Sequence, residues 1–308
     1  MRVEATKAGI KSNPQRERGR LEFSVQSPSL TLRVTFFKRQ LMTTLTLTSE
    51  QIARFHEDGY IVVPNLLNAE EIELLRNIAK ADLALERDAG SRADGEGGAV
   101  KLVVRNDLPD DTIYGAIVRS RRIVSTMEQL LGDEVYHYHH KMILKEARVG
   151  GAWAWHQDYG YWYNNGCLFP DMGSCMIAVD RATKENGCLQ VVKRSHLLGR
   201  MDHGKVGDQT GADPERVAAA LERLELIYCE LEPGAAIFFH ANTLHRSDQN
   251  KSEHPRWAFI ACYNTKHNDP YKDSKHPRYS PLETWDDSRV IEIGRRQWLE
   301  MGSLRAEQ

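Results

Sequence analysis

The pattern His-x-Asp, which can supply two metal ligands, occurs three times in this 308-residue chain: at His56/Asp58, His156/Asp158 and His267/Asp269. In an α-helix, residues i and i+2 point about 200° apart, whereas on a β-strand they share one face. His56 lies in a segment with helical periodicity, and His267 lies in a polar loop. His156 and Asp158 end an apolar, aromatic run (AWAWHQDYGYW) that favours a strand. The sequence therefore predicts that only this pair converges on one metal ion.

A third ligand must come from the histidines downstream of this pair. Two histidines and one carboxylate on one face of an octahedron are the ligand set of non-haem Fe(II) oxygenases. The segment GAAIFFHANTLHRSDQN indicates a strand up to His240, a short turn and then His245. Arg256 follows at the start of the apolar segment RWAFIACYN, where a buried guanidinium needs an anionic partner. Bidentate binding of a carboxylate would meet that need, as a dicarboxylate cosubstrate requires.

Structural roles for the same residues stay open from the sequence alone. The alternatives are a buried hydrogen bond between His156 and Asp158, a ligand at His240 in place of His245, and a salt bridge from Arg256 to Asp248 or Glu253. The run His137, His139 and His140 is a further candidate metal site, because His137 and His139 would share a face on a strand. A packed strand is the favoured interpretation, since no carboxylate partner is evident nearby in the sequence.

The predicted elements that position these residues are mostly helices in the N-terminal part of the chain and mostly strands after it. Helices are predicted at 48–59 and 68–83, which begin at the capping-box signatures Thr48/Gln51 and Asn68/Glu71, and near 113–131. A short strand is predicted at 60–63, a flexible loop at 88–98 and a helical insert at 213–224. Further strands are predicted near 134–146, 152–159, 174–180, 187–192, 225–231, 235–240 and 256–264. This pattern predicts a mainly β sandwich or barrel with flanking helices.

With these motifs the chain resembles the phytanoyl-CoA dioxygenase family of Fe(II)/2-oxoglutarate-dependent oxygenases. The matching segments are FHEDGYIVVPNLL (55–67), WHQDYGYW (155–162), ATKENGCLQVVKRSH (182–196) and LHRSDQNKSEHPRWAFIACY (244–263). The resemblance implies that His156, Asp158 and His245 are the iron ligands and catalytic residues, and that Arg256 and Ser247 bind 2-oxoglutarate. It also implies a double-stranded β-helix core, a jelly roll of cupin-like type, with flanking helices.

The implied activity is that of a dioxygenase that hydroxylates a small organic substrate with Fe(II), 2-oxoglutarate and O2, and releases succinate and CO2. Asp158 favours hydroxylation, since related halogenases have a small residue at that position. Trp153, Trp162 and Lys141 are candidates for contact with the substrate, and Lys141 or Lys145 could also pair with 2-oxoglutarate. The alternatives are packing in the core for the two tryptophans and exposure at the surface for the two lysines. Two alternatives are a cupin-like metal enzyme that does not use 2-oxoglutarate and a catalytically silent metal-binding protein.

One position departs from the family pattern. Arg194 stands where the family usually has a small residue, often glycine. If this position is a tight turn, a residue other than glycine there costs about 1 kcal/mol. Alternatively, the guanidinium could reach an anionic substrate.

Composition limits the partners and the compartment. The net charge of −2 argues against nucleic-acid binding, and no apolar stretch is long enough to cross a membrane. Five cysteines without a CxxC motif argue against a disulfide framework and favour the cytoplasm. Residues 1–41 carry nine basic and three acidic side chains, which leaves a net charge of −8 for residues 42–308.

We expect this basic leader to be disordered or not native, either an organelle-targeting presequence or sequence upstream of a true start at Met42. Residues 42–308 are expected to form a single dioxygenase domain, in which 264–308 is a polar C-terminal extension at the surface. The oligomeric state cannot be read from the sequence.

Overall fold

A seven-stranded sheet forms the larger layer of the core in the computed structural model, which describes residues 45–94 and 97–306. The expectations for residues 1–41 lie outside the described range. The strand order is β1-β11-β6-β13-β4-β3-β2, with all neighbours antiparallel. The strands are β1 (Tyr60–Val63), β2 (Gly90–Ala93), β3 (Ala99–Arg105), β4 (Val135–Lys145), β6 (Met172–Ala178), β11 (Ala236–His240) and β13 (Arg256–Thr265).

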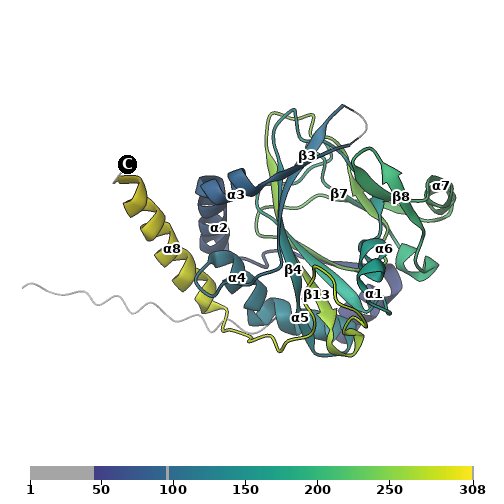
Figure 1. The fold of residues 1–308 in the computed structure, drawn as a ribbon, viewed down its shortest axis with the longest axis horizontal. Coiled ribbons are helices and arrows are strands. Elements are labelled where there is room, and N and C mark those ends of the chain that lie inside the picture. The colour runs from purple at the N-terminus through teal and green to yellow at the C-terminus, as the bar shows by residue number, and fades with distance from the viewer. Residues whose placement is uncertain (1–44, 95–96, 307–308) are drawn as a thin grey trace, which may run out of the picture. The chain divides into compact units, whose positions relative to one another are not determined.

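A four-stranded sheet of order β10-β7-β12-β5 is the second layer, and a two-stranded hairpin of β8 and β9 adjoins β5. These strands are β5 (Trp153–His156), β7 (Leu189–Val192), β8 (His203–Val206), β9 (Gln209–Ala212), β10 (Leu226–Cys229) and β12 (His245–Ser247). Two antiparallel sheets of this kind, with helices against the larger one, are consistent with the predicted jelly-roll core. Figure 1 shows the helices α2, α4 and α8 on one side of β4 and β13, with β7 and β8 on the other.

The helices begin at side chains that the sequence marks as caps. In α1 the Thr48 hydroxyl accepts from the Gln51 amide, and the Gln51 side chain accepts from the Thr48 amide. Asn68 and Glu71 form the same reciprocal pair at the start of α2. Both predicted capping boxes are therefore confirmed. The α-helices are α1 (Ser49–Asp58), α2 (Ala69–Ala81), α3 (Leu83–Asp88), α4 (Ile113–Arg119), α5 (Arg121–Leu131), α6 (Asp158–Trp162), α7 (Pro214–Arg223) and α8 (Ser288–Ala306).

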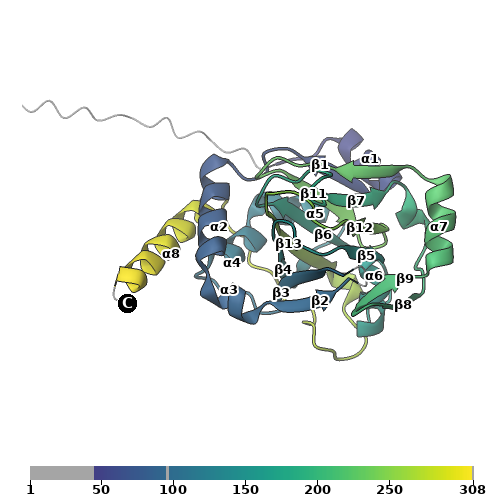
Figure 2. The ribbon, with the colours of Figure 1, turned by 90° about the horizontal axis from the view of Figure 1, so that it is seen from above.

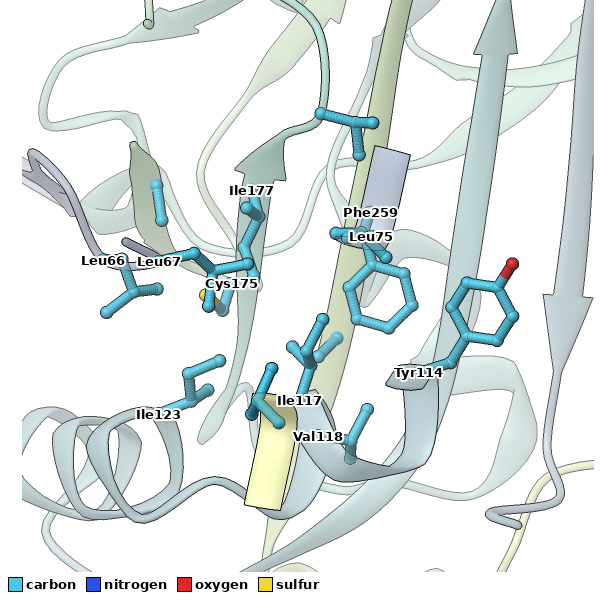
Figure 3. Packing of buried hydrophobic residues seen from close by; sticks show 14 of the residues in the cluster. Leu66, Leu67, Leu75, Tyr114, Ile117, Val118, Ile123, Cys175, Ile177 and Phe259 are labelled. Atoms are coloured by element: carbon cyan, nitrogen blue, oxygen red, sulfur yellow. The ribbon is translucent and has the colours of Figure 1, made fainter. Parts of the chain in front are cut away.

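Three apolar clusters are buried among the described residues, and the two larger ones hold these layers together. One fills the space between the large sheet and the helices, where Leu75, Ile117 and Phe259 approach one another (Figure 3). The other lies between the two sheets and includes Met176, Val191 and Phe239. Each fully buried large apolar side chain contributes roughly 1.5–3 kcal/mol. The five cysteines are all buried and unpaired: Cys175 is in the first cluster, and Cys167, Cys188, Cys229 and Cys262 are in the second.

Several boundaries differ from the sequence-based prediction. The helix predicted near 113–131 is two helices, because Ser120 has extended backbone and its hydroxyl donates to the Ile117 carbonyl. The loop predicted at 88–98 contains β2, which pairs with β3. The C-terminal extension was expected at the surface, but α8 packs on α2 and α4 (Figure 2) and buries Val290 and Ile293 completely. Within the described residues, no helix is long and apolar enough to cross a bilayer.

Arg194 adopts the left-handed conformation (φ 68°, ψ 4°) just before the short 3₁₀ helix Ser195–Leu198. The tight-turn interpretation of this position is therefore the correct one. The Arg194 side chain is half exposed, and its guanidinium lies 4.0 Å from the carboxylate of Glu57.

We predict that Arg194→Gly stabilises the protein by about 0.5–1 kcal/mol. Left-handed backbone costs an L-residue about 1–2 kcal/mol, and the greater chain entropy of glycine in the unfolded state offsets roughly 0.5–1 kcal/mol of that gain. Urea denaturation of both proteins measures the difference. A lower free energy of unfolding in the variant would show that the Arg194 side chain contributes more than its backbone costs.

A buried ion pair links the helices. Arg122 of α5 donates from Nη1 and Nη2 to the two carboxylate oxygens of Glu71, at 2.9 and 2.5 Å. Its backbone amide and Nη2 also bind Asp287, just before α8. Glu71 is fully buried, so its charge depends on Arg122 for compensation.

We predict that Glu71→Ala lowers the free energy of unfolding by about 3 kcal/mol, because the buried Arg122 guanidinium loses its two hydrogen bonds to Glu71 and keeps only the Asp287 carboxylate, 3.3 Å from its Nε, as a counter-charge. Thermal or urea denaturation measures this loss. Glu232→Ala is the matched control, since Glu232 pairs with Arg181 while both side chains are 68% exposed. Comparable losses of unfolding free energy in the two variants would contradict the stabilising role of the buried ion pair between Glu71 and Arg122.

Candidate active site

The three predicted metal ligands meet between the two sheets. One side-chain ligand atom from each of His156, Asp158 and His245 lies within 4.8 Å of the other two, and all three residues are buried. Among the described residues this is the one cluster of His, Cys, Asp or Glu that could hold a metal ion. Antiparallel pairing of β5 with β12 sets His245 directly opposite His156, and their rings are 4.0 Å apart between centroids.

Hydrogen bonds orient both imidazoles. Nδ1 of His156 donates to the Ala154 carbonyl at 2.8 Å, and Nδ1 of His245 donates to the Thr243 carbonyl at 2.8 Å. This tautomer leaves each Nε2 with a lone pair, and metal-binding histidines are commonly fixed in this way. Nε2 of His156 is 3.8 Å from Oδ1 of Asp158. The three donors therefore suit a divalent transition metal.

The protonation states also fit metal binding. Burial, with the neighbouring His245, holds the pKa of His156 well below its ordinary value, so the imidazole is neutral. Burial alone would raise the pKa of Asp158, but the Lys141 ammonium 3.7 Å away lowers it overall. The Ser174 hydroxyl also donates to Oδ2 of Asp158 at 2.9 Å. Neutral imidazoles and an ionised carboxylate are the forms that bind metal.

The local geometry of the His-x-Asp motif differs from the prediction. We expected His156 and Asp158 on one face of a continuous strand, but β5 ends at His156 and Asp158 begins the short helix α6. Gln157 between them points away from the cluster. Its side-chain amide donates to the Gly199 and Asn242 carbonyls and accepts from the Met201 amide. A strand end followed by a helix start thus brings the two ligands together.

The other histidine candidates lie elsewhere. His240 packs near Phe55 and His196, and its Nδ1 accepts from the Asn242 amide, so it does not replace His245. His267 sits between two aspartates, Asp133 and Asp171. Neither belongs to the metal-binding cluster.

The histidine run of β4 is packed, as favoured, but the prediction that His137 and His139 share one face of the strand was wrong. A bulge opposite Cys262 and Tyr263 breaks the alternation of the strand, so that His137 pairs with His140 (Nε2 to Nδ1, 3.1 Å). His139 instead approaches Trp162, with 5.6 Å between ring centroids. A bulge inserts one extra residue, and no residue type or spacing in β4 indicates it.

A cavity of about 50 Å³ is bordered by the two histidines of the candidate metal-binding cluster and by Arg256. Lys141 and Trp153 lie in its wall, as predicted for substrate-contacting residues, together with His156, His245 and Ser247. Most of the remaining wall is aliphatic or aromatic. Trp162 is not part of this wall; it is buried against Tyr138 and His139. The prediction that Trp162 contacts the substrate thus gains no support from this cavity.

Arg256 is buried and has no carboxylate of the described residues within ion-pair distance. Nη2 donates to the Gly187 carbonyl at 2.6 Å, and Nε has no hydrogen-bond partner. Burial lowers the pKa of Arg256 to about 10, so it stays charged at neutral pH. Its proposed partners are otherwise engaged: Asp248 binds Arg246 and Glu253 binds Arg148. A buried cation with a free donor, facing a cavity, fits an anionic ligand such as the distal carboxylate of 2-oxoglutarate.

Three contributors were not identified from the sequence. Ser174 binds Asp158, and Gly187 supplies the carbonyl for Arg256. Lys145, considered only as a possible anion partner, is fully buried and donates to Ser247 Oγ at 3.0 Å. The segment ENGCL contained a usable signal, since Asn-Gly predicts a turn with positive φ, and Gly187 has φ 74°.

The family model for phytanoyl-CoA dioxygenase (PhyH) matches residues 55–258. The chain belongs to this family. It is therefore a dioxygenase of the type that uses iron, 2-oxoglutarate and O2. This membership supports the 2-oxoglutarate-dependent reaction over the cupin-like and silent alternatives.

Individual relatives agree with this membership. L-proline trans-4-hydroxylase of Streptomyces griseoviridis is 29% identical over 227 residues, covering 68% of this chain and 84% of its own. Ectoine dioxygenase of Bordetella bronchiseptica is 27% identical over 234 residues, covering 71% and 75%. The crystal structure of EctD from S. alaskensis with bound Fe is similar in fold, with a TM-score of 0.66 at 22% identity, covering 78% of this chain and 88% of that one.

We predict that His245→Ala weakens binding of Mn²⁺ or Co²⁺ more than about 100-fold, because loss of even an outer-shell partner of a ligand costs roughly 10- to 100-fold. Calorimetric titration of the metal-free protein measures the dissociation constant. His240→Ala is the matched control, since this buried histidine lies outside the cluster, and it should bind metal like the unaltered protein. Equal weakening by the two substitutions would contradict the assigned ligand.

Proposed function

We propose that this protein hydroxylates a small soluble metabolite at a ferrous ion held by His156, Asp158 and His245, with 2-oxoglutarate held by Arg256 and Ser247. One observation carries the proposal: both histidines of a cluster of two histidines and one carboxylate line a cavity that is also lined by a buried guanidinium with a free donor. A 2-oxo acid with a distal carboxylate is complementary to both ends.

Iron, when bound, supplies the chemistry that couples decarboxylation of 2-oxoglutarate, to succinate and CO2, with insertion of one oxygen atom from O2 into a C–H bond. The residues of the chain bind, orient and exclude water. His156 and His245 offer Nε2 because their Nδ1 protons are committed to carbonyls. Asp158 is held ionised by Lys141 and Ser174. The apolar cavity wall keeps water from the reacting atoms.

The substrate is proposed to approach beside Lys141 and Trp153. Both lie in the wall of the cavity, and Lys141 brings a positive charge within 3.7 Å of Asp158. An ammonium there would also favour a substrate that carries an anionic group. The relatives named above act on L-proline and on ectoine, which are small molecules. The net charge of −8 over residues 42–308 offers no large basic surface for an acyl-CoA.

A cytoplasmic setting is part of the same proposal. The five cysteines are all free and buried, which suits a reducing compartment. The described helices include none that could span a membrane.

The test measures succinate after Fe(II), ascorbate and 2-oxoglutarate are added in air, including turnover without substrate. We predict that Arg256→Met lowers kcat/KM for 2-oxoglutarate at least about 30-fold, since truncating one partner of a buried charge pair costs about 2 kcal/mol or more. Arg181→Met, at an exposed position, is the matched control.

His156→Ala provides the background. Succinate release by the unaltered protein no higher than that of His156→Ala would contradict the proposed function. A normal kcat/KM in Arg256→Met would contradict the binding role of this arginine. Mass spectrometry for products 16 Da heavier, after incubation with cell-extract metabolites, would then identify the substrate class.

A further inference from the structure

Lys145, the last residue of β4, is fully buried, pairs with Arg256 across β4 and β13, and contacts Ser247 of the cavity wall. Its Nζ donates to the Ser247 hydroxyl at 3.0 Å and to the Asp248 backbone carbonyl. No carboxylate among the described residues lies within ion-pair distance of Nζ. Burial, with the nearby Arg256, holds the pKa of Lys145 well below its ordinary value. A buried lysine without a counter-charge is costly, and an anion bound nearby would offset that cost.

The backbone around Lys145 leaves room for it. A Cβ atom on Gly150 would lie 2.3 Å from Cγ of Lys145. A Cβ on Gly187 would lie 2.2 Å from the Asp248 carbonyl oxygen that accepts from Lys145. The same Gly187 supplies its own carbonyl to Arg256. Two glycines thus allow the lysine, Ser247 and Arg256 to lie side by side.

The direction of the hydrogen bond decides what Ser247 can do. A serine hydroxyl has one proton to donate and two lone pairs, whereas an ammonium can only donate. The Lys145 ammonium therefore uses an acceptor site of Ser247 Oγ, and the hydroxyl proton is free to point elsewhere. Ser247 and Arg256 both lie in the cavity wall. The free proton of Ser247 is thus available to an anion that Arg256 binds.

Register brings the two cations together. Arg256 and Lys145 are directly paired residues of the antiparallel strands β13 and β4. Nε of Arg256 is without a partner, and both cations lack a counter-charge among the described side chains. A carboxylate bound here would raise the pKa of Lys145 again, so that the charged forms of Arg256 and Lys145 and a pre-oriented hydroxyl donor would act on it together. Such a site favours a full negative charge over a neutral alkyl group.

We propose that Lys145 is a positioning residue that turns the Ser247 hydroxyl toward the distal carboxylate of the cosubstrate and, with Arg256, selects a 2-oxo dicarboxylate over a 2-oxo monocarboxylate. This inference rests on the proposed function, because it concerns the same cavity. It differs from a purely structural role, in which Lys145 would only fasten the Asp248 carbonyl. A structural role would affect all ligands of the cavity alike.

The test measures binding to the Mn²⁺-loaded protein without O2, by calorimetric titration with 2-oxoglutarate and, separately, with 2-oxovalerate, which lacks the distal carboxylate. Lys145→Met is expected to weaken 2-oxoglutarate binding about 10- to 100-fold, as for loss of hydrogen bonding and charge at an anion, and to change 2-oxovalerate binding less than about twofold. Met142→Leu is the matched control, because Met142 is buried on the same strand and lies outside this cavity.

A double-mutant cycle separates action through Ser247 from direct action. If Lys145 orients Ser247, the combined loss in Lys145→Met/Ser247→Ala is smaller than the product of the two single losses. Lys145→Gln keeps a donor for Ser247 but removes the charge, so it should recover part of the lost affinity. Circular dichroism and thermal melting establish that each variant is folded. If Lys145→Met does not fold, Lys145→Gln and Ser247→Ala carry the same comparison of the two acids.

Equal weakening for both acids, unchanged 2-oxoglutarate affinity, or independent losses in the cycle would overturn the assignment of Lys145. Failure of the proposed function has a different signature. In that case the unaltered protein itself would bind 2-oxoglutarate no better than 2-oxovalerate, and both proposals would fall together.

Discussion

The antiparallel pairing of β12 with β5 is the constraint on which the site depends. It sets His245 opposite His156, while the other edge of β12 pairs with β7. Because side chains alternate along a strand, a slip of one residue would bring Leu244 or Arg246 to the place of His245. Ser247, two residues further on, shares the buried character of His245. A single three-residue strand therefore places both a candidate metal ligand, His245, and Ser247 in the cavity wall.

Charge is distributed along the cavity in a way that the protein alone does not neutralise. Asp158 balances Lys141 at the metal-binding end. At the other end Arg256 and Lys145 have no acidic side chain of the described residues to pair with, although both are buried. Such an arrangement lowers stability in the absence of an anion, and an anionic ligand bound in the cavity would offset the cost of burying these two groups. Elsewhere the chain compensates buried charge fully, as in the pair of Arg122 with Glu71.

The sequence predicted the members of the cluster of His156, Asp158 and His245, and the fold class, because both depend on local signals. Capping boxes, the His-x-Asp motif and the position of Arg256 at the start of an apolar strand could be read from residue type and spacing. The bulge that separates His137 from His139 and the helix start at Asp158 could not, since both depend on how β4 and β5 meet their neighbours. The role of Lys145 was equally hidden: only the tertiary structure shows that it is buried without a carboxylate partner.

The burial of the five thiols in two separate clusters has a practical consequence. Burial raises the pKa of each thiol, for example that of Cys262 and Cys229 to about 12, so the native thiols are slow nucleophiles as well as shielded ones. Cys175 lies between sheet and helices, and the other four lie between the sheets. The rate at which a thiol reagent modifies each cysteine of the intact protein therefore measures local opening around that cysteine. Modification of Cys175 measures opening between sheet and helices, and modification of the other four measures opening between the sheets.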